Sequence, residues 1–181
     1  YAMLASDLMD FVEYLEQHPH QLPSLKKSMG SGDSVPFELH ERFRRLFGWE
    51  VMEGCGITEL GGYYAVHRGP SAHKLHPEPA EAGAAGSHRS GALGGPAPAT
   101  RIRIQRADGT AALPGEVGEI VVHSPSVMTG YWQQPEATRE VLRDGWLQTG
   151  DLGYFDSQQE LWFVGRRKLM IVRRGSNIAP A

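Results

Sequence analysis

Trp49-Glu50-Val51-Met52 runs directly into Glu53-Gly54-Cys55-Gly56-Ile57-Thr58-Glu59, and the architecture that we expect for the chain follows from these residues. Residues 49–52 predict a short strand that ends where the glycines begin. Two glycines at a strand end let the backbone approach a ligand closely. The hydroxyl and carboxylate that follow suit a phosphate oxygen and its counter-ion, since Mg²⁺ is usually held by one or two carboxylates plus phosphate oxygens. From the residues alone, a tight turn with solvated polar side chains is the open alternative.

Upstream of this stretch the chain alternates between helix and strand. Helical spacing predicts a first helix that ends at His18-Pro19-His20, and its apolar stripe is formed by Leu4, Leu8, Phe11, Val12 and Leu15. Residues 25–29 predict a strand that runs into Gly30-Ser31-Gly32-Asp33. A second helix follows, with Pro36 in its first turn and Gly48 at its end. This order favours a parallel α/β layer with ligands at the carboxyl ends of its strands.

Downstream, the composition changes twice. Residues 77–100 are mostly Ala, Gly, Pro and Ser, which predicts a flexible loop that we place at 72–99. After this loop, period-two alternation and the Asp108-Gly109 turn signal predict a small antiparallel sheet or barrel-like unit. Its expected strands are residues 101–105, 117–123, 146–149, 161–164 and 170–173, with one short helix at 135–142.

Two further stretches carry polar groups suited to a nucleotide. Asp151, in Thr149-Gly150-Asp151, can accept two hydrogen bonds from a sugar diol, and an Asx turn is the alternative. Gly165-Arg166-Arg167-Lys168 offers guanidinium groups for phosphate or ribose, and a solvated basic face is the alternative. The sequence contains no phosphate-loop, dinucleotide or nucleophile-elbow motif, and His73 and His76 lack the partners of a zinc site.

The overall composition excludes some partners. The 181 residues carry a net charge of -3, with a pI near 6.3, which gives no general case for binding nucleic acid or an anionic membrane. No apolar run reaches the roughly 20 residues of a membrane span, and no secretion signal is evident. The single cysteine, Cys55, fits a reducing compartment, so we expect a cytoplasmic protein. Both ends of the sequence read as internal to a longer protein.

Taken in order, the motifs resemble those of the adenylate-forming (AMP-binding) superfamily, and in particular its acyl-CoA synthetases. The resemblance rests on the segments 31–36 (Ser-Gly-Asp-Ser-Val-Pro), 52–60, 118–120 with 130–138, 145–153, and 165–180. It implies a piece of the large domain, truncated at the hinge to the C-terminal domain. On this basis we expect an α/β portion over residues 1–71, the loop over 72–99, an antiparallel β subdomain over 100–164, and the hinge with the start of the C-terminal domain over 165–181.

The resemblance also implies a reaction and a set of roles. A carboxylic acid would react with ATP to give an acyl-adenylate, and a thiol, usually that of CoA, would then displace AMP. Ser31, Gly32, Gly54, Cys55, Gly56 and Ile57 would line the nucleotide. Thr58 would contact the phosphate, Glu59 would help bind Mg²⁺, Asp151 would hold the ribose hydroxyls, and Arg166 would reach the ribose and phosphate. Thr58 and Glu59 would thus be the catalytic pair. Fatty acid metabolism is the general area that the resemblance suggests.

Departures from the family pattern keep two alternatives open. Cys55 stands where the family usually has an aromatic residue stacked on adenine, and Leu169 stands where its hinge commonly has Asp. These changes motivate a non-catalytic nucleotide-binding or interaction module. A nonribosomal-peptide-type adenylation domain that loads a carrier protein is the other alternative. The family's phosphate loop and C-terminal lysine fall outside residues 1–181, so the isolated chain is expected to be inactive.

Overall fold

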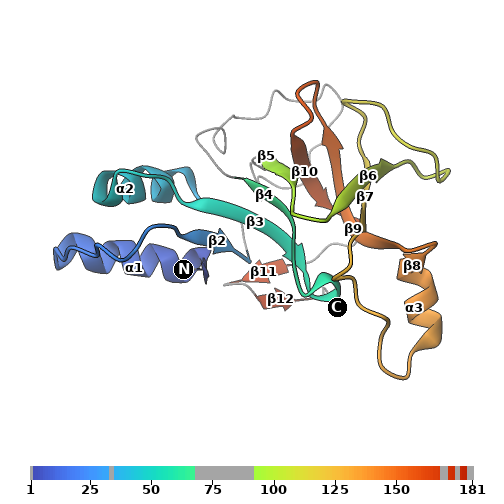
Figure 1. Ribbon diagram of the computed structural model, residues 1–181, viewed down its shortest axis with the longest axis horizontal. Coiled ribbons are helices and arrows are strands. Elements are labelled where there is room, and N and C mark those ends of the chain that lie inside the picture. The colour runs from blue at the N-terminus through green and yellow to red at the C-terminus, as the bar shows by residue number, and fades with distance from the viewer. Residues whose placement is uncertain (1, 33–34, 68–91, 168–170, 174–175, 179–181) are drawn as a thin grey trace.

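The computed structural model describes residues 2–32, 35–67, 92–167, 171–173 and 176–178 (Figure 1). The helical elements in these ranges are α1 (Ala5–Gln17), α2 (Phe37–Phe47), the 3-10 turn η1 (Thr58–Leu60) and α3 (Pro135–Val141). The strands are β1 (Ala2–Leu4), β2 (Met29–Ser31), β3 (Met52–Ile57), β4 (Gly62–His67), β5 (Ala92–Pro96), β6 (Arg101–Gln105), β7 (Gly118–His123), β8 (Leu142–Arg143), β9 (Trp146–Phe155), β10 (Leu161–Arg166), β11 (Ile171–Arg173) and β12 (Ser176–Ile178). Among these described residues, no helix has the length and apolar character needed to cross a membrane.

The first part of the chain is the predicted parallel α/β layer. β1 pairs in parallel with β2, and β2 pairs in parallel with β3, with α1 and α2 as the two crossovers. Both predicted helices are confirmed, and Gly48 ends α2 in the left-handed conformation at φ 74°. The prediction is wrong for Leu4, which was assigned to the apolar stripe of the first helix: it lies in β1 and is 36 % exposed. Pro36 lies one position earlier than predicted, at the N-cap, where its backbone is extended. Figure 1 shows the two helices side by side at one end of the molecule.

The strands of this layer lie further along the chain than predicted. β2 begins at Met29, where the predicted strand over 25–29 ended, and β3 begins at Met52 and continues through Gly54-Cys55-Gly56. The cause is the pairing of β3 with β4, an antiparallel strand that the pattern did not reveal. A Cβ on Gly56 would lie 2.1 Å from the carbonyl oxygen of Gly62, so the ladder closes there because glycine leaves room for the opposing backbone.

β4 and β5 join the two halves of the chain into one sheet. In the described residues the sheet has ten strands in the order β1-β2-β3-β4-β5-β10-β9-β7-β6, with β8 paired to β9. β5 lies within the segment predicted as a flexible loop, so that prediction is wrong for residues 92–96; residues 72–91 are outside the described ranges. A Cβ on Gly94 would lie 2.5 Å from the carbonyl oxygen of Val66, which explains why glycine stands at this position of the strand.

The second part is antiparallel, as predicted, but its sheet is not closed into a barrel. β1 and β6 are the two ends of the described strand order, with no pairing between them. The strand over 101–105 is confirmed, the Asp108-Gly109 turn follows it with Gly109 at φ 86°, and β6 pairs with β7 throughout. β9 is longer than the predicted strand over 146–149 and runs through Gly150 and Asp151. β11 covers all but the first residue of the predicted strand over 170–173, and Met170 is outside the described residues. The prediction that this strand joins the antiparallel unit is wrong, because β11 pairs with β12 in a separate two-stranded sheet.

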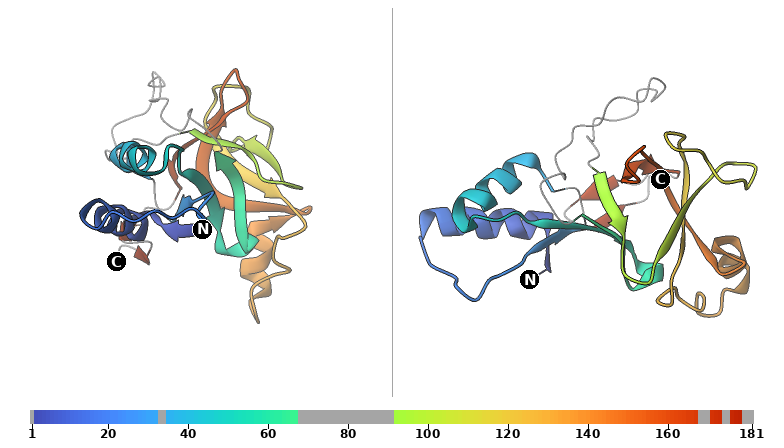
Figure 2. Two further views of the ribbon diagram at one scale, coloured as in Figure 1. Left: turned by 60° about the vertical axis from the view of Figure 1, so that its left-hand side comes forward. Right: turned by 45° about the horizontal axis from the view of Figure 1, so that its top comes forward.

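Two buried cores explain how the sheet is held in shape. The first lies between α1, α2 and the parallel strands, and its buried members are Ala5, Leu8, Val12, Val35, Leu39, Phe43 and Val51. The second gathers Leu60, Tyr64, Ala65, Ile104, Ile120, Val122 and Leu161. Because this second core takes side chains from β4 and from β6, which lie far apart in the strand order, the sheet must curl (Figure 2). A curled but open sheet is the outcome. The domain boundaries at 71/72, 99/100 and 164/165 stay predictions.

Gly48→Ala is expected to lower the free energy of unfolding by about 1 kcal/mol, because alanine is strained in the left-handed conformation. A Cβ at this position would meet nothing within 4 Å, so the effect isolates the backbone. Urea unfolding of the gene product that carries this chain, followed by tryptophan fluorescence, measures the change. Gly48→Asn is the matched control and should cost less, because asparagine tolerates this conformation. Equal stability of the wild type and Gly48→Ala would contradict the assignment.

Candidate functional site

The predicted phosphate-side residues stand at the carboxyl end of a parallel strand. β3 ends at Ile57, and Thr58 and Glu59 follow at once in η1, which Gly61 terminates at φ 64°. Leu60, 1 % exposed, fixes this turn to the second core. Ligands of open α/β sheets bind at this edge, so the position agrees with the chemistry expected of a hydroxyl and a carboxylate at 58 and 59.

A chain of hydrogen bonds connects the Gly-Cys-Gly segment to Asp151. The Cys55 thiol donates to the Tyr64 hydroxyl oxygen over 3.0 Å, and the Tyr64 hydroxyl donates to Asp151 Oδ2 over 3.0 Å. Arg166 Nε then donates to Asp151 Oδ1 over 2.8 Å. Three sequence-predicted site residues, Cys55, Asp151 and Arg166, are therefore brought together, and Tyr64 is the link that sequence reasoning missed.

Asp151, predicted to accept hydrogen bonds from a sugar diol, is almost completely buried. The residue is 1 % exposed, and each carboxylate oxygen already accepts a hydrogen bond from the protein. Burial raises the pKa of Asp151, against the opposing effects of the Arg166 charge and the Tyr64 hydrogen bond; the charge of Glu59 raises it further. The Arg166 side chain is 33 % exposed. Of the two partners, only Arg166 is reached by solvent, so a ligand that approaches Asp151 meets the guanidinium first.

Two hydrogen bonds that the sequence did not predict hold Glu59 in position. The Tyr131 hydroxyl donates to Glu59 Oε1 over 2.7 Å, and the backbone N–H of Met128 donates to the Glu59 carbonyl oxygen over 2.8 Å. Burial, together with the hydrogen bond to Glu59, raises the pKa of Tyr131 to about 12. Tyr131 lies in segment 130–138, one of the segments that resemble the family. The resemblance therefore indicated this part of the chain, but it did not predict the hydrogen bond to Glu59.

A single protein carboxylate fits Mg²⁺, which usually keeps several waters and takes one or two carboxylates plus phosphate oxygens. Within the described ranges, no group of three or more His, Cys, Asp or Glu side chains could form an all-protein metal cage. Glu59 at the strand end is thus compatible with a metal that arrives with a phosphate. His73 and His76 lie outside the described residues.

The Glu119 carboxylate connects Gly150, the neighbour of Asp151 in β9, to Arg167, the neighbour of Arg166. Its Oε1 accepts the Gly150 backbone N–H over 3.1 Å, and its Oε2 accepts Arg167 Nη1 over 2.9 Å. Thr149 Oγ1 donates to the Ile120 carbonyl oxygen over 2.6 Å and accepts the Asp151 N–H over 3.0 Å. The quoted 118–120 motif is therefore the frame beneath residues 149–151. Lys168 and Leu169, the predicted hinge, lie outside the described residues.

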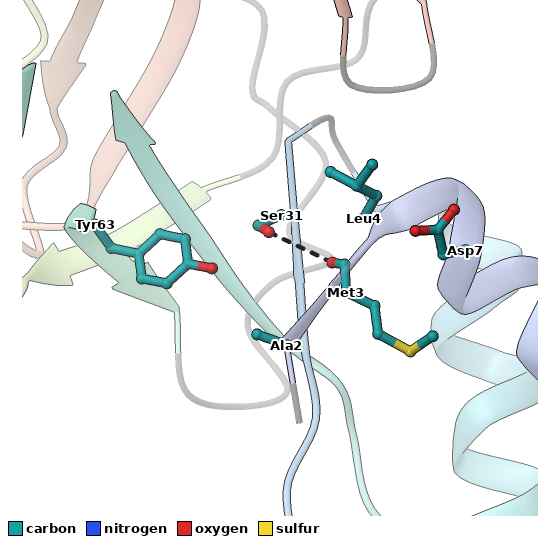
Figure 3. A pocket seen from close by; sticks show the side chains of 6 residues that line it. All are labelled: Ala2, Met3, Leu4, Asp7, Ser31 and Tyr63. Carbon is teal, nitrogen blue, oxygen red and sulfur yellow. Dashed lines mark hydrogen bonds between the residues drawn. The ribbon is translucent and has the colours of Figure 1, made fainter. Parts of the chain in front are cut away.

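Ser31, one of the residues predicted to line the nucleotide, borders a hollow beside β3. Ser31 ends β2 and donates from Oγ to the Met3 carbonyl oxygen over 3.4 Å, and Gly32 follows at φ 81°. The hollow has a volume of about 480 Å³ and is lined by Ala2, Met3, Leu4, Asp7, Ser31 and Tyr63 (Figure 3). A Cβ on Gly54 would lie 2.6 Å from the Tyr63 ring, so this ring lies directly over β3. Ser31 and the Gly-Cys-Gly segment are therefore neighbours.

Cys55 is expected to react slowly. Burial raises the pKa of its thiol to about 12, and the Tyr64 hydrogen bond only partly opposes this rise. Because the thiolate is the reactive species, iodoacetamide at pH 8 should alkylate Cys55 at least tenfold more slowly in the folded gene product than in urea. Mass spectrometry of the Cys55 peptide at timed intervals gives both rates. Equal rates would show that the thiol is open to solvent.

The comparisons with known proteins agree with this geometry. Residues 2–132 match the family described as AMP-binding enzyme, and the chain belongs to that family. The chain is 37 % identical over 157 residues to the long-chain-fatty-acid–CoA ligase of Salmonella typhimurium, covering 87 % of this chain and 25 % of that protein. It is 38 % identical over 173 residues to the sulfoacetate–CoA ligase of Cupriavidus necator, covering 93 % and 31 %.

Solved structures give the same assignment. The o-succinylbenzoate coenzyme A synthetase (MenE) of Bacillus subtilis, in complex with ATP and magnesium ion, superposes with a TM-score of 0.73 at 28 % identity, over 99 % of this chain and 34 % of that one. The chain thus spans about a third or less of the proteins that it matches. The family and the α/β fold with one large sheet follow directly from these matches.

Proposed function

We propose that the protein carrying this chain is an ATP-dependent carboxylic acid:CoA ligase, and that this chain supplies the adenine, ribose and Mg²⁺ side of its site. One observation carries the proposal: the Gly-Cys-Gly segment and Asp151 are joined through Tyr64 by two hydrogen bonds of 3.0 Å each. These contacts connect two elements that lie far apart in sequence, which supports a common site for them. Membership of the AMP-binding family and the similarity to named CoA ligases support the same reading.

The reaction would proceed in two displacements. A carboxylate oxygen attacks the α-phosphorus of ATP, the bond to the bridging oxygen breaks, and pyrophosphate leaves. A thiolate then attacks the acyl carbon, and AMP leaves. Bound Mg²⁺ neutralises phosphate charge in such chemistry, and Glu59 would hold it, with Thr58 on a phosphate oxygen. Asp151 and Arg166 would hold the ribose, and the backbone from Gly54 to Ile57, with Ser31 and Gly32, would border the base.

The acid is best identified by experiment. A long-chain fatty acid and sulfoacetate differ greatly in size and polarity, yet the two ligases named for them are 37 % and 38 % identical to this chain. Overall identity therefore does not select the acid. A role in fatty acid metabolism and a cytoplasmic location stay predictions from the sequence.

Pyrophosphate release tests the proposal. The gene product is incubated with ATP, Mg²⁺ and a panel of short, long, aromatic and sulfonated acids, with CoA or a carrier-protein thiol as acceptor. Release that depends on one class of acid, followed by acyl transfer to CoA, is the expected result. Transfer only to the carrier-protein thiol would select the adenylation-domain alternative. No release with any acid would overturn the ligase proposal.

A non-catalytic nucleotide-binding module is the second candidate, and Cys55 favours it. Cys55 stands where the family usually has an aromatic residue stacked on adenine, and Leu169 stands where its hinge commonly has Asp. AMP binding by calorimetry together with no pyrophosphate release would select this candidate. Turnover at ordinary rates would eliminate it.

A further inference from the structure

The position of Tyr64 is unusual for a residue that contacts a carboxylate on β9. In the strand order, β5 and β10 separate β4 from β9, which would place the two strands roughly 14 Å apart in a flat sheet. The sheet curls, and the Tyr64 hydroxyl reaches Asp151 across 87 positions of sequence. Tyr64 is 0 % exposed and belongs to the second core, so packing fixes its ring.

The two partners of Asp151 differ in how easily they can leave. Tyr64 on Oδ2 is fully buried, and its hydroxyl is itself oriented by the Cys55 thiol, which donates to it. Arg166 on Oδ1 has a side chain that is 33 % exposed, at the end of β10. Water can solvate a displaced guanidinium, whereas a displaced Tyr64 hydroxyl would be left without its partner in the core.

We propose that Tyr64 is a positioning residue: it anchors Asp151 through Oδ2, with Cys55 orienting its hydroxyl, and it leaves Oδ1, beneath the removable Arg166, for the ribose hydroxyls of the nucleotide. This inference rests on the proposed function. It assigns different tasks to the two oxygens of one carboxylate. It also gives Cys55 a role that does not depend on stacking against the base.

Electrostatics supports this assignment. The Tyr64 hydrogen bond and the Arg166 charge both favour the ionised form of Asp151, and burial and Glu59 oppose them. Removing the Tyr64 hydroxyl should therefore raise the pKa of Asp151 further. The groups that face the carboxylate are Tyr64 from β4, Cys55 from β3, Arg166 from β10 and Glu59 from η1. Only the first is altered in the test.

Tyr64→Phe in the complete gene product is the test. AMP affinity by calorimetry at pH 7 should fall about tenfold, in line with the loss of a hydrogen bond to a charged group. The acid limb of AMP binding, and the Asp151 pKa read from carbonyl-labelled NMR spectra, should both move to higher pH. Tyr154→Phe is the matched control: it removes a hydroxyl from a tyrosine 6 % exposed on β9, and its AMP affinity should stay within twofold of wild type.

The outcomes separate the two proposals. If the wild type binds AMP and Asp151→Ala abolishes binding, but Tyr64→Phe binds like wild type, the positioning role is overturned and the proposed function stands. The same conclusion follows if Tyr154→Phe weakens binding equally, or if the Asp151 pKa does not move. If the wild type binds no AMP at 10 mM, the proposed function fails and this inference falls with it.

Discussion

Asp151→Asn is expected to lower kcat/KM for ATP by at least 100-fold. The substitution keeps the shape of the side chain but removes the charge, and an amide nitrogen cannot accept a hydrogen bond. Hydrogen bonds to charged groups contribute about 1.5–3 kcal/mol each, so loss of the two bonds to the ribose diol, about 3–6 kcal/mol together, corresponds to this factor or more. Initial rates of pyrophosphate release against ATP concentration, together with calorimetry on AMP, measure the effect.

Folding should not be the cause of that loss. Burial raises the pKa of Asp151, so this group stabilises the fold fully below pH 4 and loses that contribution as pH rises through the raised value. At pH 7 the ionised, buried carboxylate is therefore a cost, and asparagine removes it. Thermal unfolding of Asp151→Asn should be unchanged or slightly higher. Asp144→Asn, an exposed carboxylate in a left-handed turn at φ 50°, is the control and should keep normal kinetics.

A loss of less than threefold in Asp151→Asn would contradict a role for Asp151 in nucleotide binding. A large loss in both Asp151→Asn and Asp144→Asn would instead point to a general charge effect. Only a loss confined to Asp151 agrees with the geometry.

Gly56→Ala is expected to lower the free energy of unfolding by about 3 kcal/mol, at the upper end of what overpacking costs. The added Cβ would lie 2.1 Å from the carbonyl oxygen of Gly62 and 2.9 Å from its carbonyl carbon, so two backbones must separate. This contact holds β3 to β4, and β4 carries Tyr64. Urea unfolding measures the stability, and AMP affinity should fall together with it.

Gly62→Ala is the matched control on the opposing strand. A Cβ at Gly62 meets nothing within 4 Å, so its stability should lie within about 0.5 kcal/mol of wild type. If Gly56→Ala is as stable as Gly62→Ala, the close approach of the two strands is wrong. If only Gly62→Ala loses stability, then Gly62 and not Gly56 is the position that has no room for a Cβ.

The elements that sequence predicted well are those fixed by local physics. α1 and α2 follow from the spacing of Leu8 and Val12 and from Gly48 as a stop, and these cues lie within a few residues of each other. β3 and β9 extend beyond their predicted ends because other strands pair with the added residues: β4, which follows β3 closely in sequence, and β7 and β10 on either side of β9. β5 was missed because two of its five residues are glycine and it ends at Pro96, so no apolar alternation marks it in the sequence. The close backbone contact that Gly94 permits is visible only once β4 lies beside it.

The candidate site divides in the same way. The sequence predicted the glycines at the strand end and Asp151 after Gly150 as site residues. The structure brings Cys55 and Asp151 into one chain of hydrogen bonds. Tyr64, Tyr131 and Glu119 were missed as functional positions. Their partners lie 87, 72 and 31 residues away, and only the curled sheet reveals which side chains meet.

The central claim is that one adenosine spans the Gly-Cys-Gly segment and the carboxylate of Asp151. A crystal structure of the gene product grown with AMP tests it most directly. We predict ribose oxygens about 3 Å from Asp151, the base against the backbone of residues 54–56, and Arg166 moved away from Oδ1. AMP bound elsewhere, with the pair between Asp151 and Arg166 intact, would contradict the account.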